Sequence, residues 1–138
     1  MPLDIAAYIA VLQSKLQTGV ASEHTYRSAL EKLLEDAAVD HNMQVANDPK
    51  KIKEIGKPDF ILLRGDTPMA YVETKDLVKS LDSKDDKEQF ERYIKGLPNL
   101  IITNYREFCW YVAGEHRQTV IIATVKGEKI TSHQTLNR

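Results

Sequence analysis

Apolar residues recur at helical spacing over residues 22–38, which predicts an amphipathic helix. Ser22 stands just before this stripe and has the side chain of a helix N-cap. A shorter amphipathic pattern over residues 3–16 predicts an accessory helix, separated from the first by a loop around Thr18 and Gly19.

The pattern changes to strand-like runs after His41. Residues 43–46 predict a short strand, and the lysine-rich residues 47–57 predict a loop. The apolar run 60–63 and the alternating run 69–75 predict a β-hairpin whose turn covers residues 64–68, where Gly65 and Pro68 stand.

A third helical stripe comes after the hairpin. Ser83 and Asp86 resemble a capping box, and the stripe after them ends at Gly96 and Pro98. β-branched and aromatic residues then predict three strands, at residues 100–103, 108–112 and 119–125. The residues after Lys126 show no periodic pattern. We therefore expect an α/β (α+β) fold.

The predicted hairpin brings two acids together. If Leu63 pairs with Met69 across the turn, counting back along both strands places Asp59 opposite Glu73. Directly opposed residues have β-carbons about 5 Å apart, so two carboxylates there call for a cation or a proton between them. Strand periodicity puts Lys75 on the same face as Glu73.

Two carboxylates and an amine suit phosphodiester hydrolysis. Mg²⁺, for which Mn²⁺ substitutes, binds hard oxygen ligands such as Asp59 and Glu73 and keeps several waters. The Lys75 ammonium can orient a water or stabilise the transition state. Pro58 favours an extended strand entrance just before Asp59. The alternative for Glu73 and Lys75 is a solvated strand face in a chain with 28% charged residues.

Three further residues are candidates for the same site. On the helix predicted over residues 22–38, Glu23 lies nearest the centre of the apolar stripe, which makes it a candidate third carboxylate. Its alternative role is a favourable interaction with the helix dipole. Arg27, near the same helix end, and Lys57, just before the hairpin, are candidate DNA contacts, although an exposed surface arginine is the simpler interpretation of Arg27.

These residues resemble a known family. Pro58-Asp59 and the later Glu73-Thr74-Lys75 resemble the PD-(D/E)xK nucleases. Gln89 and Tyr93 match the Q-x-x-x-Y motif of nuclease domains in type I and type ISP restriction enzymes, and residues 97–108 resemble the segment directly after that motif in such domains. The alternative for this pair is a polar helix flank with a packed tyrosine.

The resemblance implies a restriction-endonuclease-like core, in which helices flank a central mixed β-sheet. It implies Mg²⁺-dependent cleavage of double-stranded DNA, with Asp59, Glu73 and Lys75 as the catalytic core. It also implies that residues 1–138 are the amino-terminal nuclease domain of a larger restriction-modification protein with covalently linked translocase or methyltransferase domains. The sequence contains neither a Walker lysine motif nor a methyltransferase signature.

Composition and net charge limit the class of protein in which this site occurs. A chain of 138 residues with 42% hydrophobic residues is the size of one domain with a real core. No apolar run approaches the roughly 20 residues of a membrane span and no signal peptide is evident, so we expect no membrane partner and a cytoplasmic, prokaryotic location. The net charge of -1 argues against a broad basic DNA-binding face. Cys109 is the only cysteine and the histidines are scattered, so no zinc site is expected.

Two other function classes stay open. One is a catalytically silent nuclease-fold module that binds DNA or a partner protein. The presence of Asp59, Glu73 and Lys75 together weighs against it, because a binding module has no chemical need for two facing acids and an amine. The other is a nuclease acting on RNA or branched DNA, since the same metal chemistry acts on any phosphodiester.

Overall fold

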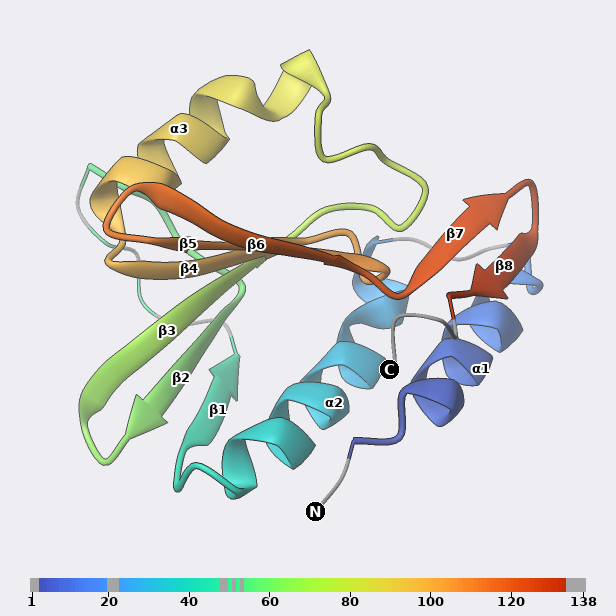
Figure 1. The fold of residues 1–138 in the computed structure, drawn as a ribbon, viewed down its shortest axis with the longest axis horizontal. Helices are drawn as coiled ribbons and strands as arrows, with labels where there is room; N and C mark the ends of the chain where they lie inside the picture. The colour runs from blue at the N-terminus through green and yellow to red at the C-terminus, as the bar shows by residue number, and fades with distance from the viewer. Residues whose placement is uncertain (1–2, 20–22, 48–49, 51, 53, 134–138) are drawn as a thin grey trace.

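A six-stranded mixed β-sheet with helices on both faces dominates the structure, a computed structural model that describes residues 3–19, 23–47, 50, 52 and 54–133 (Figure 1). The strand order is β1-β2-β3-β4-β5-β6, and only β3 and β4 are parallel neighbours. The expected α+β architecture, a mixed sheet flanked by helices, is confirmed.

The described elements agree closely with the predicted order. The helical segments are α1 (Ile5–Leu16), the 3-10 turn η1 (Glu23–Tyr26), α2 (Arg27–Val39), the 3-10 turn η2 (Lys84–Asp86) and α3 (Lys87–Gly96). The strands of the large sheet are β1 (Gln44–Asn47), β2 (Phe60–Arg64), β3 (Thr67–Thr74), β4 (Asn99–Thr103), β5 (Glu107–Val112) and β6 (Glu115–Ile121). A separate hairpin consists of β7 (Ala123–Lys126) and β8 (Lys129–Ser132).

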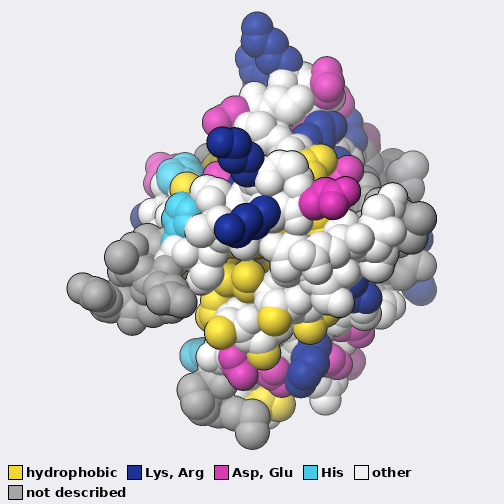
Figure 2. Space-filling view, turned by 90° about the vertical axis from the view of Figure 1, so that its right-hand side faces the viewer, with side chains coloured by type: hydrophobic (Ala, Val, Ile, Leu, Met, Phe, Trp, Pro, Cys, Tyr) yellow, Lys and Arg dark blue, Asp and Glu magenta, His cyan; other side chains and the backbone are white. Residues whose placement is uncertain are grey.

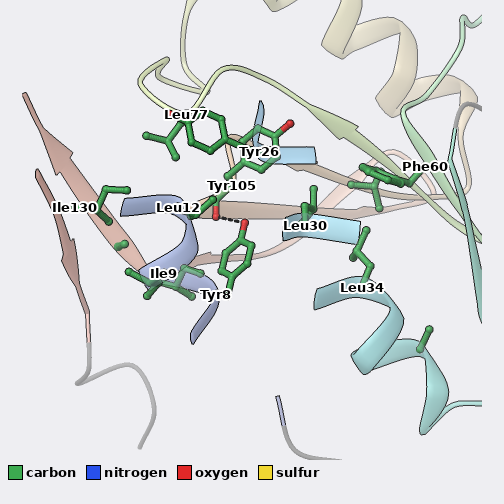
Figure 3. Packing of buried hydrophobic residues seen from close by; sticks show 14 of the residues in the cluster. Tyr8, Ile9, Leu12, Tyr26, Leu30, Leu34, Phe60, Leu77, Tyr105 and Ile130 are labelled. Carbon is green, nitrogen blue, oxygen red and sulfur yellow. Dashed lines mark hydrogen bonds between the residues drawn. The ribbon is translucent and has the colours of Figure 1, made fainter. Parts of the chain in front are cut away.

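The main core lies between the sheet and the layer of α1 and α2. Figure 3 shows Leu12 and Leu30 of the two helices in the same cluster as Phe60 of β2. The Tyr8 hydroxyl donates a hydrogen bond of 2.6 Å to the carbonyl oxygen of Tyr105, so the polar end of this buried ring is satisfied. This core fixes the start of α2 against the sheet.

The opposite face of the sheet is covered by α3, which connects the parallel strands β3 and β4 (Figure 1). Its stripe of Phe90, Tyr93 and Leu97 packs against Leu100 and Ile102 of β4. The crossover places the first turns of α3 near the carboxyl end of β3. The residues that carry the predicted chemistry lie there.

The hairpin turn differs from the predicted one. Leu63 pairs with Pro68 rather than with Met69, because the turn is only two residues long, with Gly65 at a φ of +63°. A β-bulge at Met69 then adds one residue to β3. The pairs from Leu62–Ala70 back to Phe60–Val72 therefore match the expected register. The shorter turn and the bulge offset each other, so the register next to Asp59 is the predicted one.

Other boundaries also needed correction. The run predicted as one strand over residues 119–125 is divided at Ile122 between β6 and β7. The tail beyond Lys126, which shows no pattern, contributes β8, where Ile130 is buried. The long helix begins as η1 rather than as regular α-helix, and Ser22 lies outside the described residues. Ser83 caps η2 through Asp85, while the Asp86 carboxylate pairs with Lys79.

The side of the molecule that carries α1 and the β7–β8 hairpin has a mixed surface. Figure 2 shows positive and negative side chains interspersed on it, with hydrophobic side chains gathered below the centre. Charges of both signs therefore alternate on this side instead of forming one basic field. Among the described residues, no helix is long and apolar enough to cross a membrane.

Candidate active site at the end of the β2–β3 hairpin

Asp59 lies at the entrance of β2, directly after the buried Pro58. Its backbone N–H donates to the carbonyl oxygen of Val72 at 3.0 Å, which extends the hairpin by one residue. Its Oδ2 accepts hydrogen bonds from both the backbone N–H and the hydroxyl of Thr74, each 2.8 Å long. Its Oδ1 forms an ion pair with Arg27 at the start of α2. Asp59 is thus held both by the neighbouring strand and by a helix.

Glu73 is the buried acid of the pair, with only 5% of its surface exposed. Burial is the largest cause that raises the pKa of Glu73, to about 8, and the negative charge of Asp59 raises it further, while Lys75 opposes both. Among the described residues, its Oε1 has no hydrogen-bond partner. A buried carboxylate oxygen without a donor is costly, so this position favours a proton or a cation.

Lys75 comes directly after β3 and points its ammonium into the same cluster. Its Nζ donates to Gln89 Oε1 at 2.6 Å and lies 3.6 Å from Glu73 Oε2 and 3.7 Å from Asp86 Oδ1. The ammonium also lies 5.7 Å from the centre of the Phe90 ring, within cation–π range. Lys75 thus places its amine among an amide oxygen, two acids and an aromatic ring.

Gln89 and Tyr93 connect the amine to the loop before Asp59. Burial raises the pKa of the Tyr93 hydroxyl, and hydrogen bonds from the Gln89 side chain and the Lys57 backbone act in the opposite direction. Gln89 thus contacts both Tyr93 and Lys75, whose ammonium donates to its Oε1. The motif therefore holds Lys75 in place.

Gly56 fits tightly against the same tyrosine ring. Its φ is +137°, and a β-carbon there would lie 2.6 Å from Tyr93 Cε1 and 2.7 Å from Tyr93 Oη. Only glycine combines this backbone conformation with so close an approach. The loop that leads to Asp59 is thereby fixed on α3.

The structure brings most of the sequence candidates together. Asp59, Glu73, Lys75, Gln89 and Tyr93 form one connected cluster. Arg27, a candidate DNA contact, forms an ion pair with Asp59, and its contact with DNA stays a prediction. The Lys57 side chain is exposed, as a DNA contact requires. The Glu23 backbone lies in η1, but its side chain is outside the described residues, so its role as a third carboxylate stays a prediction.

Two contributors were missed by sequence reasoning. Thr74, the middle residue of the E-x-K motif, satisfies Asp59 Oδ2. Asp86 lies near Lys75 from the end of η2. Asp86, Gln89 and Tyr93 are three and four residues apart and share one helix face, so extending the motif back by one turn would have found Asp86.

The donor set fits a hard divalent cation. Asp59 and Glu73 supply neighbouring carboxylates, and Mg²⁺ commonly uses one or two carboxylates while retaining waters. Among the described residues, no group of three or more His, Cys, Asp or Glu side chains could hold a metal ion. Two carboxylates suit Mg²⁺ or Mn²⁺, since such ions fill much of their coordination with water.

The fold is shared with a protein solved in complex with DNA. The chain superposes on part of a cryo-EM structure of a DrdV–DNA complex with a TM-score of 0.68 and 24% sequence identity. The match covers 83% of this chain but only 12% of the longer one. No family model and no curated protein matches the chain.

This similarity concerns the fold. At 24% identity, it agrees with the nuclease-like architecture expected from the sequence, and the roles of individual residues rest on the site geometry. The match spans only a small part of that protein's length.

Proposed function

We propose that this chain is a divalent-metal-dependent nuclease domain that hydrolyses phosphodiester bonds in DNA. The observation that carries the proposal is the buried Glu73 Oε1, which has no hydrogen-bond partner among the described residues and stands beside a second carboxylate and an ammonium. The DNA in the complex of similar fold supports DNA as the substrate. Linked translocase or methyltransferase domains stay a prediction from sequence resemblance.

Each residue has a separate task in this reaction. Asp59 and Glu73 would hold the cation, which when bound lowers the pKa of a coordinated water and neutralises charge on the phosphate. Lys75 donates hydrogen bonds to the phosphate or to the attacking water, since Gln89 keeps its ammonium at the site. Hydrolysis adds water across one P–O bond and yields a phosphomonoester and an alcohol.

Asp59→Asn should abolish cleavage of supercoiled plasmid DNA with Mg²⁺ or Mn²⁺ at low salt. The amide keeps an oxygen for the Thr74 donors but removes the negative charge needed to hold a cation. Asp66→Asn, in the exposed hairpin turn, is the matched control and should cleave like the natural protein.

Cleavage that survives Asp59→Asn would exclude this active site. If the natural protein cleaves neither plasmid DNA nor RNA and binds no Mn²⁺ in calorimetry, the chain is a binding module with a nuclease fold. Cleavage of RNA alone would keep the site and change the substrate class.

Gln89→Leu should lower the single-turnover cleavage rate by about tenfold without changing metal affinity, because Lys75 loses the acceptor that positions it. Gln89→Glu, which retains an acceptor for Lys75, should restore part of the rate. Gln118→Leu, on the exposed strand β6, is the control. Natural rates in both Gln89 variants would reduce this residue to a packing role.

A further inference from the structure

Arg27 occupies an unusual position beside the candidate metal ligands. It is the first residue of α2, its side chain is only 28% exposed, and one of its Nη atoms contacts Asp59 Oδ1. Its Nε is buried and has no hydrogen-bond partner among the described residues. Nη2 is therefore engaged by a carboxylate while Nε is not hydrogen-bonded within the described residues.

The two oxygens of Asp59 differ in what they can still bind. Oδ2 accepts two hydrogen bonds from Thr74, which occupy both of its lone pairs. Oδ1 is the oxygen available to a new ligand, and it is the oxygen that Arg27 holds. A cation at this site must therefore meet the guanidinium at Oδ1.

Electrostatic repulsion determines whether the Arg27 guanidinium stays at Asp59 Oδ1 when a cation binds there. The Arg27 guanidinium balances the acid pair in this structure, together with Lys75. A divalent cation bound between Asp59 and Glu73 would stand within a few ångströms of the guanidinium, where like charges in a poorly solvated site repel strongly. This repulsion favours dissociation of the guanidinium from Asp59.

We propose that Arg27 exchanges partners during the reaction cycle: it pairs with Asp59 in the metal-free protein and, once a divalent cation is bound there, contacts a backbone phosphate of the DNA. The inference rests on the proposed nuclease function. The planar guanidinium suits a phosphate because two of its N–H groups can donate in parallel, and Nε supplies the second donor. Arg27 thus couples metal binding to DNA binding.

The exchange can be followed at the arginine itself. The Arg27 Nε–Hε resonance, assigned by its loss in Arg27→Lys, should shift on titration of the full chain with Ca²⁺, which uses the same oxygen ligands without supporting cleavage in most Mg²⁺ sites. The shift should saturate at the affinity measured by calorimetry, and a short DNA duplex should shift it again. The Arg117 resonance, from a surface pair with Glu115 on β6, is the control and should not move.

Affinities give a second readout. Arg27→Ala should bind Ca²⁺ about tenfold more tightly than the natural protein and the duplex more weakly, because one competitor and one phosphate contact are lost. If calorimetry shows Ca²⁺ binding while the Arg27 resonance stays fixed, the exchange is wrong and the metal site stands. If neither Ca²⁺ nor Mg²⁺ binds at all, the proposed function fails with it.

Discussion

Glu73→Gln is expected to abolish metal-dependent cleavage and, without metal, to make the protein more stable at pH 8 than the natural chain. The folded protein keeps the Glu73 proton up to a pH of about 8, whereas the unfolded chain loses it near 4.5, because the pKa of Glu73 is raised on folding. Between these values the unfolded state binds fewer protons, so the free energy of unfolding falls as the pH rises. Glutamine resembles the protonated acid and removes this dependence, with a gain on the order of a few kcal/mol above pH 8.

Denaturant unfolding in EDTA between pH 5 and 9 measures this effect. The two proteins should have similar stability near pH 5 and diverge as the pH rises. Glu115→Gln, at an exposed position of β6, should show no such divergence. A Glu73→Gln protein that is less stable than the natural one at pH 8, or that still cleaves, would contradict the role of Glu73 as a buried, metal-binding acid.

Lys75→Met should lower the single-turnover cleavage rate by about 100- to 1,000-fold while leaving metal affinity almost unchanged, the scale of removing one preorganised donor to a developing charge. Methionine preserves the length of the side chain and its packing beside Phe90, so only the ammonium is removed. Lys95→Met, at an exposed position on α3, provides the control. An unchanged rate in Lys75→Met would remove this amine from the mechanism.

The placement of the two acids could be predicted because period-two alternation fixes which residues of a hairpin face each other. The predicted register holds from Leu62–Ala70 to Phe60–Val72, next to the two acids, although the turn was assigned five residues instead of two. A β-bulge at Met69 compensated for the shorter turn, and bulges leave little mark on hydrophobic patterning. The strand register was therefore predicted more reliably than the length of the turn.

The partner of Asp59 could not be predicted in the same way. Arg27 lies 32 positions earlier in the chain, and its contact depends on how α2 packs against the sheet. Helical periodicity identifies the buried face of α2 but not which strand residue its first turn approaches. The small β7–β8 hairpin was missed for a related reason, since β8 has one buried apolar residue, Ile130, and a single residue makes no pattern.

The pattern also could not show how Gln89 and Tyr93 act. Their spacing predicted a shared helix face, which the structure bears out through their hydrogen bond. That Gln89 faces Lys75 depends on the crossover from β3 through α3 to β4, which sets the helix over the carboxyl end of β3. The chemistry of the motif is thus a property of the fold and not of the helix alone.

Gly56, in the loop before Asp59, is constrained by the position of the Lys75 amine, which it does not contact. Any side chain at this position would displace the Tyr93 ring, and through Tyr93 and Gln89 the displacement would reach the Lys75 amine. A lineage that keeps the proposed active site consequently has almost no freedom at Gly56. Selection on the proposed reaction would therefore act on a residue that lies two side chains away from Lys75.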